Sequence, residues 1–325
     1  MSIADIHTFL GEDLSRVEAH IDAALRSNVR LVDSTNRHLR EHPGKMLRPM
    51  LSLLVAGALG RVNESSFRYA AATELLHNAT LLHDDVVDGA SERRGMPTVA
   101  SLLGGSAAVL VGDFWLVRCL DLVLEAEVDS ERVLRLFSDT LGHLAEGELL
   151  QMELAGLGTT TEADYLRIIY GKTASLFVTA ALSAAISVKA PAPLCRAAET
   201  FAARLGTAFQ IKDDILDYLP DAALGKPVGL DLREQKITQP LLCALESVPQ
   251  QEAAAIREKV AGIGDHPEWE ADVRAFVAAQ DGVSRAKEVM NRYLEEALES
   301  LSAFPPSASK THLAALTRYF GDRDF

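Results

Sequence analysis

The chain has 325 residues, of which 48% are hydrophobic and 24% charged, so it can bury a large core and is not a disordered protein. Its formal net charge is −14. This charge argues against a general nucleic-acid binder and against a protein of anionic membrane surfaces, because both classes gather lysine and arginine.

The three cysteines lie far apart, without the spacing of a zinc site or the number needed for a disulfide framework. They fit a reducing compartment, and no signal peptide is visible, so we expect a cytoplasmic protein. The longest uncharged run, residues 173–188, is shorter than the roughly 20 apolar residues that span a membrane. We expect this run to form a buried helix and expect no membrane span.

Apolar residues recur at intervals of three and four along most of the chain, which predicts helices. The predicted core faces include Leu51, Leu54, Val55 and Ala58, then Ile168, Ile169 and Leu176, then Phe201, Leu205, Ala208 and Ile211. Glycine and proline place the breaks, in chain order, at 42–44, 60–63, 95–97, 104–105, 156–161, 190–193, 219–229, 249 and 304–306. These breaks predict about a dozen helices in one all-α domain, residues 1–325, because no linker divides the chain.

Two acidic clusters share the spacing DDxxD within apolar, helical surroundings. They are Asp84, Asp85 and Asp88, and Asp213, Asp214 and Asp217. On a helix, the first and last carboxylates of each cluster lie one turn apart on one face and repel each other. A single cluster would be read as a solvated acidic face. Two copies with apolar flanks instead favour two facing carboxylate walls that hold hard divalent cations. Magnesium takes few protein carboxylates and completes its shell with water and phosphate oxygens, so the clusters predict a diphosphate ligand.

Basic residues lie beside turns close to these clusters in the sequence. They are Lys45, Arg48, Arg93, Arg94, Lys226 and Lys236. Each one alone would be read as a surface charge. Their placement in so acidic a chain favours the binding of a diphosphate.

With these residues in place, the chain resembles the trans-isoprenyl diphosphate synthases, the chain-elongating prenyltransferases. The matching pieces occur in family order: residues 44–49 (GKMLRP), 74–88, 93–95, 112–114 (GDF), 146–148 with Gln151, 172–173, 209–217 and 225–240. The resemblance implies an all-α bundle around a central cavity, of the isoprenoid synthase type, and a homodimer. The segment 234–240 departs from the pattern, with Gln where many relatives have Gly and Leu, while Lys236, Thr238 and Pro240 remain.

The resemblance also implies roles for individual residues. Asp84, Asp85 and Asp88 would bind magnesium on the allylic diphosphate, and Asp213, Asp214 and Asp217 would complete a cluster of three magnesium ions. Isopentenyl diphosphate would be held by Lys45, Arg48, His77 and Arg94. The allylic diphosphate would be held by Arg93, Lys172, Lys226 and Lys236. Thr173 and Gln210 would face the reacting carbons, and Arg323 would lie near a diphosphate.

The implied reaction is a 1'-4 head-to-tail condensation. The allylic carbon–oxygen bond ionises, isopentenyl diphosphate attacks the allylic cation, and proton loss gives the longer chain. Magnesium and cationic side chains stabilise the leaving diphosphate. The released diphosphate is the expected base, since the sequence offers no dedicated one. The residues expected to act in catalysis are Asp84, Asp85, Asp88, Lys172, Thr173, Gln210 and Asp213.

Product length is expected to depend on the helix that leads back from Asp84. Relatives that make short products commonly place an aromatic residue near Ala79 and Thr80, and the small side chains here leave the path open. A floor is expected at Phe67 or Tyr69, about 25 Å away on a continuous helix. At roughly 5 Å per isoprene unit that depth admits at least five units. We therefore expect a long, octaprenyl-like product of the kind used in quinone side chains.

Other functions remain open at this point. A short-chain synthase making farnesyl or geranylgeranyl diphosphate is the nearest alternative. A class I terpene cyclase usually replaces the second cluster with an Asn/Ser/Glu motif, and head-to-head synthases lack the Gly-Lys-x-x-Arg-Pro loop. A non-catalytic subunit of a heteromeric synthase would tend to lose one cluster, and a helical scaffold would leave both clusters unexplained.

Overall fold

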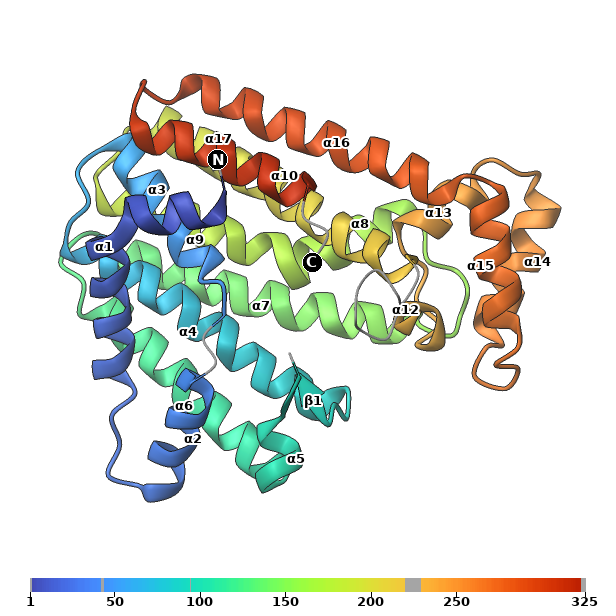
Figure 1. Cartoon of the computed structure of the whole chain (residues 1–325), viewed down its shortest axis with the longest axis horizontal. Helices are drawn as coiled ribbons and strands as arrows, with labels where there is room; N and C mark the ends of the chain where they lie inside the picture. Colours follow the sequence, from blue (N-terminus) through green and yellow to red (C-terminus); the bar gives the residue numbers. More distant parts are fainter. Residues whose placement is uncertain (1, 42–43, 94, 220–228, 323–325) are drawn as a thin grey trace. The chain divides into compact units, whose positions relative to one another are not determined.

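The computed structural model describes residues 2–41, 44–93, 95–219 and 229–322, and these are helical nearly throughout (Figure 1). The all-α prediction is confirmed. The helices are α1 (Ile3–Ala24), α2 (Arg30–Glu41), α3 (Leu47–Leu59), α4 (Glu64–Val87), α5 (Val99–Leu103), α6 (Gly105–Leu124), α7 (Ser130–Leu154), α8 (Glu162–Ile169), the π-helical turn η1 (Tyr170–Ala174), α9 (Ser175–Ser187), α10 (Ala192–Asp217), α12 (Leu230–Arg233), α13 (Gln239–Leu245), α14 (Gln250–Ala261), α15 (Trp269–Ala279), α16 (Gly282–Ser300), the 3₁₀ turn η2 (Leu301–Ala303) and α17 (Ala308–Asp322).

Several breaks between helices and one strand pair were not predicted. Unforeseen breaks separate α1 from α2, α6 from α7, α12 from α13, α14 from α15 and α15 from α16. The break between α6 and α7 ends at Asp129, which has a left-handed φ of 49° and directly precedes α7. A short antiparallel pair, β1 (Glu92–Arg93) and β2 (Met96–Pro97), follows α4. The predicted break at 219–229 falls largely outside the described residues.

The chain forms two compact units, and each gathers separate stretches of sequence. The first holds Met1–Ser138, Thr179–Ala198 and Ala303–Leu313, and the second holds Asp139–Val178, Glu199–Ser302 and Ala314–Phe325. Helices α7, α9, α10 and α17 contribute residues to both units. The single domain over 1–325 stays a prediction.

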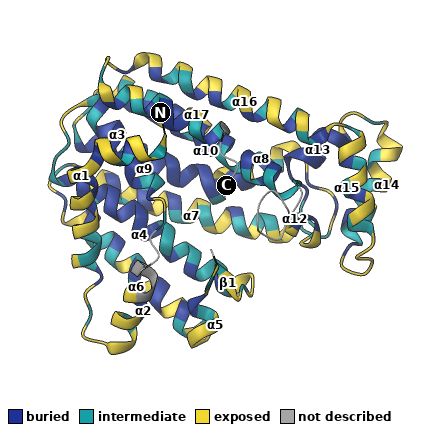
Figure 2. Cartoon of the chain, in the orientation of Figure 1, coloured by how far each residue is buried: buried dark blue, intermediate teal, exposed yellow. Residues whose placement is uncertain are grey.

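Helix α4 is the centre of the first unit. It packs mainly against α6, and also against α3 and α1. Buried residues lie on every side of it, as expected for a central helix. Figure 2 shows this burial as a dark-blue run along α4. The predicted core faces on α3, α8 to α9 and α10 are all buried, so these predictions are confirmed.

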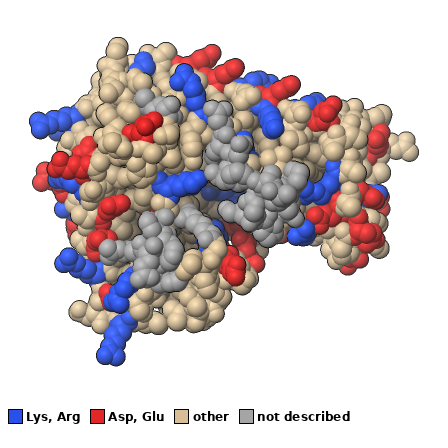
Figure 3. Space-filling view, in the orientation of Figure 1, with Lys and Arg blue, Asp and Glu red and all other residues tan. Residues whose placement is uncertain are grey.

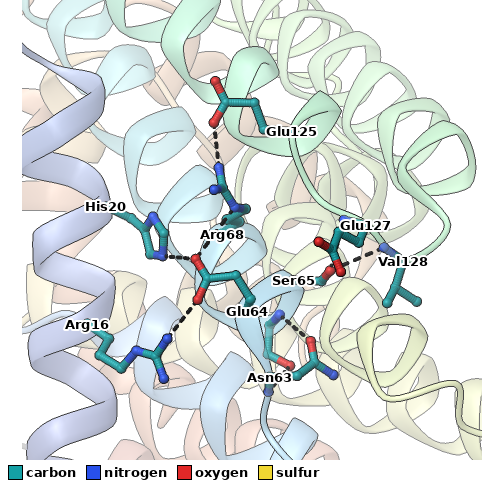
Figure 4. A network of polar contacts seen from close by, with 10 residues as sticks. Arg16, His20, Asn63, Glu64, Ser65, Arg68, Glu125, Glu127 and Val128 are labelled. Atoms are coloured by element: carbon teal, nitrogen blue, oxygen red, sulfur yellow. Dashed lines mark hydrogen bonds and ion pairs between the residues drawn. The ribbon is translucent and has the colours of Figure 1, made fainter.

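The N-terminal end of α4 is tied to its neighbours by ionic contacts (Figure 4). The Glu64 carboxylate lies 2.7 Å from the Arg16 guanidinium and 2.9 Å from Nε2 of His20. Arg68 lies 3.7 Å from Glu64 and also pairs with Glu125. Burial lowers the pKa of His20, while the Glu64 charge opposes that shift. An acidic residue in a first turn also suits the positive end of the helix dipole.

Neutral contacts complete this end of α4. The Asn63 side chain accepts the Ser66 N–H at 3.2 Å and so caps the helix. The Ser65 hydroxyl oxygen accepts the N–H groups of Glu127 and Val128, at 3.1 and 3.2 Å. The start of α4 is thus fixed to the connection between α6 and α7.

In the second unit, α8, η1 and the start of α9 belong to one continuous helical stretch, Glu162–Ser187. In the described part of the chain, this is the one stretch long and apolar enough to cross a membrane, but 83% of its apolar window is buried inside the fold. It is therefore a core helix, in line with the prediction for residues 173–188.

Aromatic packing and paired charges complete the second unit. The ring centroid of Phe209 lies 5.3 Å from that of Phe177 and 5.1 Å from that of Phe320, which joins α10 to α9 and α17. Acidic side chains gather over α14 and α15 in Figure 3. Some of them are paired, since Glu270 lies 2.9 Å from Arg233 and Asp272 contacts Lys259.

Candidate active site

The first acidic cluster lies at the C-terminal end of α4. Asp84 is half-buried, Asp85 is buried, and Asp88 is the exposed C-cap residue. The C-terminal end of a helix carries the negative end of its dipole, which adds to the repulsion among the three carboxylates. This end of α4 therefore favours a bound cation more strongly than the spacing alone predicts.

The Arg93 guanidinium reaches this cluster. Nε of Arg93, on β1, donates to Oδ1 of Asp85 at 2.7 Å. The Asp85 side chain is 6% exposed and that of Arg93 36%, so the pair is partly shielded from water. The unforeseen strand pair is what brings Arg93 back to α4. Arg94 lies outside the described residues.

The Gly112–Asp113 pair on α6 packs against the residue before the cluster. A Cβ at Gly112 would lie 2.3 Å from Nε2 of His83, so only glycine leaves room for this ring. Nε2 of His83 also lies 3.5 Å from Oδ1 of Asp113. The matched segment 112–114 therefore sets how closely α6 approaches the end of α4.

The described residues assigned to isopentenyl diphosphate lie at the start of α3 and on α4. Lys45 is exposed and Arg48 half-buried, on either side of the start of α3. Met46 between them has a left-handed φ of 52°, and its side chain does not cap the helix. The backbone N–H groups of a helix start suit an anion. His77 is half-buried on α4.

The predicted tail path follows α4, which is continuous from Glu64 to Val87. Ala79 is fully buried and Thr80 half-buried, with the Thr80 hydroxyl donating to the carbonyl of His77 at 2.8 Å. At the far end, the Arg16 guanidinium lies 4.2 Å from the Phe67 ring centroid. The Tyr69 hydroxyl donates to the carbonyl of Val128. Both candidate floor residues are thus buried and held in place.

The second acidic cluster lies in the last turn of α10. Asp213 is half-buried. Asp214 is buried and accepts hydrogen bonds from the Tyr165 hydroxyl at 2.5 Å, from the Gln210 amide at 3.0 Å and from the backbone of Gln239. Burial raises the pKa of Asp214 to about 6, and the hydrogen bonds only partly offset this.

Asp217 caps a neighbouring helix. Its carboxylate accepts the backbone N–H groups of Gly229, Leu230 and Asp231 at 3.0, 3.1 and 3.2 Å. These groups form the start of α12, where a negative charge is stabilised. Burial raises the pKa of Asp231 well above its usual range, and the nearby Asp214 and Asp217 charges raise it further.

The residues assigned to the reacting carbons contact each other. The Thr173 hydroxyl, on η1, donates to Oε1 of Gln210 at 2.6 Å. The Gln210 amide N–H donates to Oδ1 of Asp214 at 3.0 Å, so the three side chains form one directed chain of hydrogen bonds. Nζ of Lys172 lies 2.5 Å from Oε2 of Glu148 on α7.

The second unit holds a cavity of about 220 Å³ beside these side chains. Its polar lining includes Lys172, Gln210, Asp214, Asp231, Lys236 and Thr238. Lys236 is held by Glu234. Gln235, where many relatives have Gly, has a left-handed φ of 59°, which explains why glycine suits that position. Lys226 and Arg323 lie outside the described residues.

Three residues of this site carried no assigned role in the sequence analysis. Tyr165 and Asp231 reach Asp214 and Asp217 from α8 and α12. Glu148 belongs to a matched segment, but its contact with Lys172 depends on the packing of α7. No spacing rule links such single polar residues across the sequence.

The donor set suits magnesium. The carboxylate oxygens of the clusters are hard ligands, and Mg²⁺ usually takes one or two of them together with substrate phosphates. Within residues 2–41, 44–93, 95–219 and 229–322, no three His, Cys, Asp or Glu side chains converge as a ready-made metal cage. Such a set fits an ion that also needs oxygens from a diphosphate.

Comparison with known proteins gives a consistent result. Residues 29–279 match the family described as polyprenyl synthetase. The chain is 38% identical to octaprenyl diphosphate synthase of Haemophilus influenzae, over 100% of this chain and 98% of that protein. It is 39% identical to the all-trans-nonaprenyl-diphosphate synthase (geranyl-diphosphate specific) of Rhodobacter capsulatus, over 98% and 97%. A polyprenyl synthase of Caulobacter crescentus, crystallised with calcium and isoprenyl diphosphate, superimposes with a TM-score of 0.90 at 32% identity, over 100% and 98%.

Proposed function

The chain belongs to the polyprenyl synthetase family and is a prenyltransferase, and from this premise we propose that it makes a long, octaprenyl-like all-trans diphosphate. The substrates are isopentenyl diphosphate and an allylic diphosphate, joined by 1'-4 head-to-tail condensation. The observation that carries this proposal is the pair of complete DDxxD clusters, each at the C-terminal end of a helix. The products become quinone side chains.

Magnesium is the proposed cofactor, with three ions per site when diphosphate is bound. Asp84, Asp85 and Asp88 hold it from α4, and Asp213, Asp214 and Asp217 from α10. When bound, it supplies charge neutralisation for the leaving diphosphate. The hard donor set and the position of each cluster at the C-terminal end of a helix support this assignment.

The protein's own residues hold and orient the two substrates. Arg93, Lys172, Lys226 and Lys236 bind the allylic diphosphate, and Lys45, Arg48, His77 and Arg94 bind isopentenyl diphosphate. The Thr173 hydroxyl donates its hydrogen bond to Gln210, so the lone pairs of the hydroxyl oxygen are left to face an allylic cation. The apolar walls exclude water from that cation.

The long product is supported by the small side chains of α4. Ala71, Ala72 and Ala79 are fully buried, and the helix runs unbroken to Phe67. An Ala79→Phe substitution is expected to shorten the main product by several isoprene units, because an aromatic ring would block the path. The measurement is the chain length of dephosphorylated products. An unchanged product would contradict this role for Ala79 and favour a short-chain synthase.

The proposed assembly is a homodimer. Leu110, Val117 and Leu124 on α6 are 68%, 54% and 57% exposed. They recur every two turns and so form one apolar stripe on this helix. An apolar stripe of this kind is typical of a self-associating surface and supports the proposal. The proposed compartment is the cytoplasm, which suits three buried, unbridged cysteines.

The test is direct incubation of the purified chain with magnesium, labelled isopentenyl diphosphate and farnesyl diphosphate. Heptaprenyl to decaprenyl products are expected. Products ending at geranylgeranyl would retain the chemistry and overturn the long-chain assignment. A lack of elongation with any allylic primer would overturn the catalytic proposal and favour a subunit that needs a partner.

A further inference from the structure

The turn that carries Lys172 and Thr173 is not α-helical. In η1, the Ser175 N–H donates to the carbonyl of Tyr170, five residues earlier. The Ser175 hydroxyl donates to the carbonyl of Gly171 at 2.8 Å and so satisfies it where the backbone register changes. π-Helical turns are rare and occur mostly at functional sites. Something in the surrounding structure must therefore favour this one.

On one side, η1 touches α7 backbone to backbone. A Cβ at Gly147 would lie 3.0 Å from the backbone nitrogen of Lys172 and 3.1 Å from Cα of Gly171. A Cβ at Gly171 would lie 2.5 Å from the carbonyl oxygen of His143. These neighbours are backbone atoms, which cannot rotate away as a side chain could.

On another side, η1 is equally close to α10. A Cβ at Gly206 would lie 2.6 Å from Cα of Ala174 and 3.0 Å from its Cβ. All three glycines are buried. Glycine within a helix costs about 0.5–1 kcal/mol relative to alanine, so a compensating reason for each is required.

Each helix that approaches η1 also supplies a side chain that holds it. Glu148, next to Gly147, lies 2.5 Å from Nζ of Lys172. Gln210, one turn after Gly206, accepts the Thr173 hydroxyl proton at 2.6 Å. The contacts of α7 and α10 with η1 therefore set both the distance between these backbones and the direction of the Lys172 and Thr173 side chains.

We propose that Gly147, Gly171 and Gly206, together the glycine clasp, are positioning residues that set the place of the π turn and so direct Lys172 and Thr173. This inference rests on the proposed function, which gives Lys172 and Thr173 their roles. Added bulk at the clasp moves the backbone of η1 by tenths of an ångström. A misplacement of 1 Å can cost about 100-fold in rate, so even this displacement has a measurable effect.

The test compares Gly147→Ala with Gly142→Ala in the full-length enzyme. Both changes lie on α7, but a Cβ at Gly142 meets nothing within 4 Å. Gly147→Ala is expected to lower kcat about 10-fold. The KM for isopentenyl diphosphate is expected to stay unchanged, because the described residues proposed to bind that substrate lie at the start of α3 and on α4. Gly142→Ala is expected to match the wild type.

The outcomes separate positioning from simple packing. A kcat within two-fold of wild type for Gly147→Ala would overturn the proposal. Equal losses in both variants, or a rise in the KM of isopentenyl diphosphate matching the loss in kcat, would overturn it too. An inactive wild type would instead refute the proposed function, on which the inference depends.

A second variant covers the case in which Gly147→Ala lowers the melting temperature. Ser175→Ala removes the hydroxyl that satisfies Gly171 without adding bulk, and Ser183→Ala is its control because Ser183 is also buried and donates to a helix carbonyl. Ser175→Ala is expected to lower kcat several-fold while Ser183→Ala does not. Equal activity of the two serine variants would overturn the proposal.

Discussion

Asp85 and Asp214 are the middle residues of two clusters with the same spacing, and both are buried, but different partners hold their carboxylates. Asp85 faces the Arg93 guanidinium at 2.7 Å. Among the described residues, the hydrogen-bond donors to Asp214 are neutral: the Tyr165 hydroxyl, the Gln210 amide and the backbone of Gln239. A cation compensates the first charge within the protein, whereas the second depends on hydrogen bonds in a buried setting.

The comparison shows that one sequence motif can be given two electrostatic environments. At the second cluster, burial outweighs the hydrogen bonds and raises the pKa of Asp214 to about 6. Burial also raises the pKa of the nearby Asp231, and the charges of Asp214 and Asp217 raise it further. The second cluster therefore gains more from an external cation than the first, which has Arg93 beside it.

The largest expected effect comes from the leading aspartate of each cluster. Asp84→Asn and Asp213→Asn are each expected to lower kcat about 10²–10³-fold, because each removes charge that stabilises the leaving diphosphate through its metal. Steady-state assays at several magnesium concentrations measure this. If the two clusters differ in this way, added magnesium should restore the activity of Asp84→Asn more fully than that of Asp213→Asn, since Arg93 still provides a positive charge at the first cluster. Asp121→Asn on α6 is the control, because the half-buried Asp121 pairs with Arg118 and belongs to neither cluster.

A smaller effect concerns pH and stability. The pKa of Asp214 is raised from its ordinary 3.8 to about 6, so the folded chain binds this proton more tightly than the unfolded chain. The resulting stabilisation is complete below about pH 4 and is lost as the pH rises through about 6. Relative to Asp214→Asn, the wild type should lose about 3 kcal/mol of unfolding free energy over this range.

Urea unfolding of the metal-free proteins measures this difference. Asp214→Asn should be the more stable protein at pH 7 although it is less active. Asp139→Asn, at an exposed position, should follow the wild type at every pH. If the unfolding free energies of the wild type and Asp214→Asn changed with pH in parallel, the pKa of the Asp214 carboxyl would not be raised in the folded protein.

The smallest expected effect distinguishes the partners themselves. Arg93→Gln and Tyr165→Phe should each lower the unfolding free energy by about 1–3 kcal/mol at low salt, since each removes a donor to a buried carboxylate. The Arg93 side chain is 36% exposed, so added salt should reduce the loss of unfolding free energy caused by Arg93→Gln but not the loss caused by Tyr165→Phe. Unfolding at 0.05 and 0.5 M salt tests this. Equal salt dependence in both variants would remove the distinction between the clusters.

Much of the fold could be predicted because it depends on periodicity. The apolar faces of α3 and α10 are regular repeats, and most breaks coincide with glycine or proline. The turn ending at Asp129 could not be predicted, because no glycine or proline marks it. Within the site, the DDxxD spacing identifies the acidic residues. It does not show that Asp217 caps α12 or that Tyr165 holds Asp214, because those contacts depend on how distant helices pack.

The π turn holds one residue more than an α-helical turn would hold in the same place. Deleting one residue from η1 would restore α-helical bonding and leave the helix after it nearly in phase, because the π turn had absorbed the extra residue. The buried side chains of Leu176 and Phe177 would then stay in the core. A deletion within the regular part of α9 would instead rotate all later residues of that helix by about 100°. A change of length in η1 should therefore preserve the fold and redirect only Lys172 and Thr173.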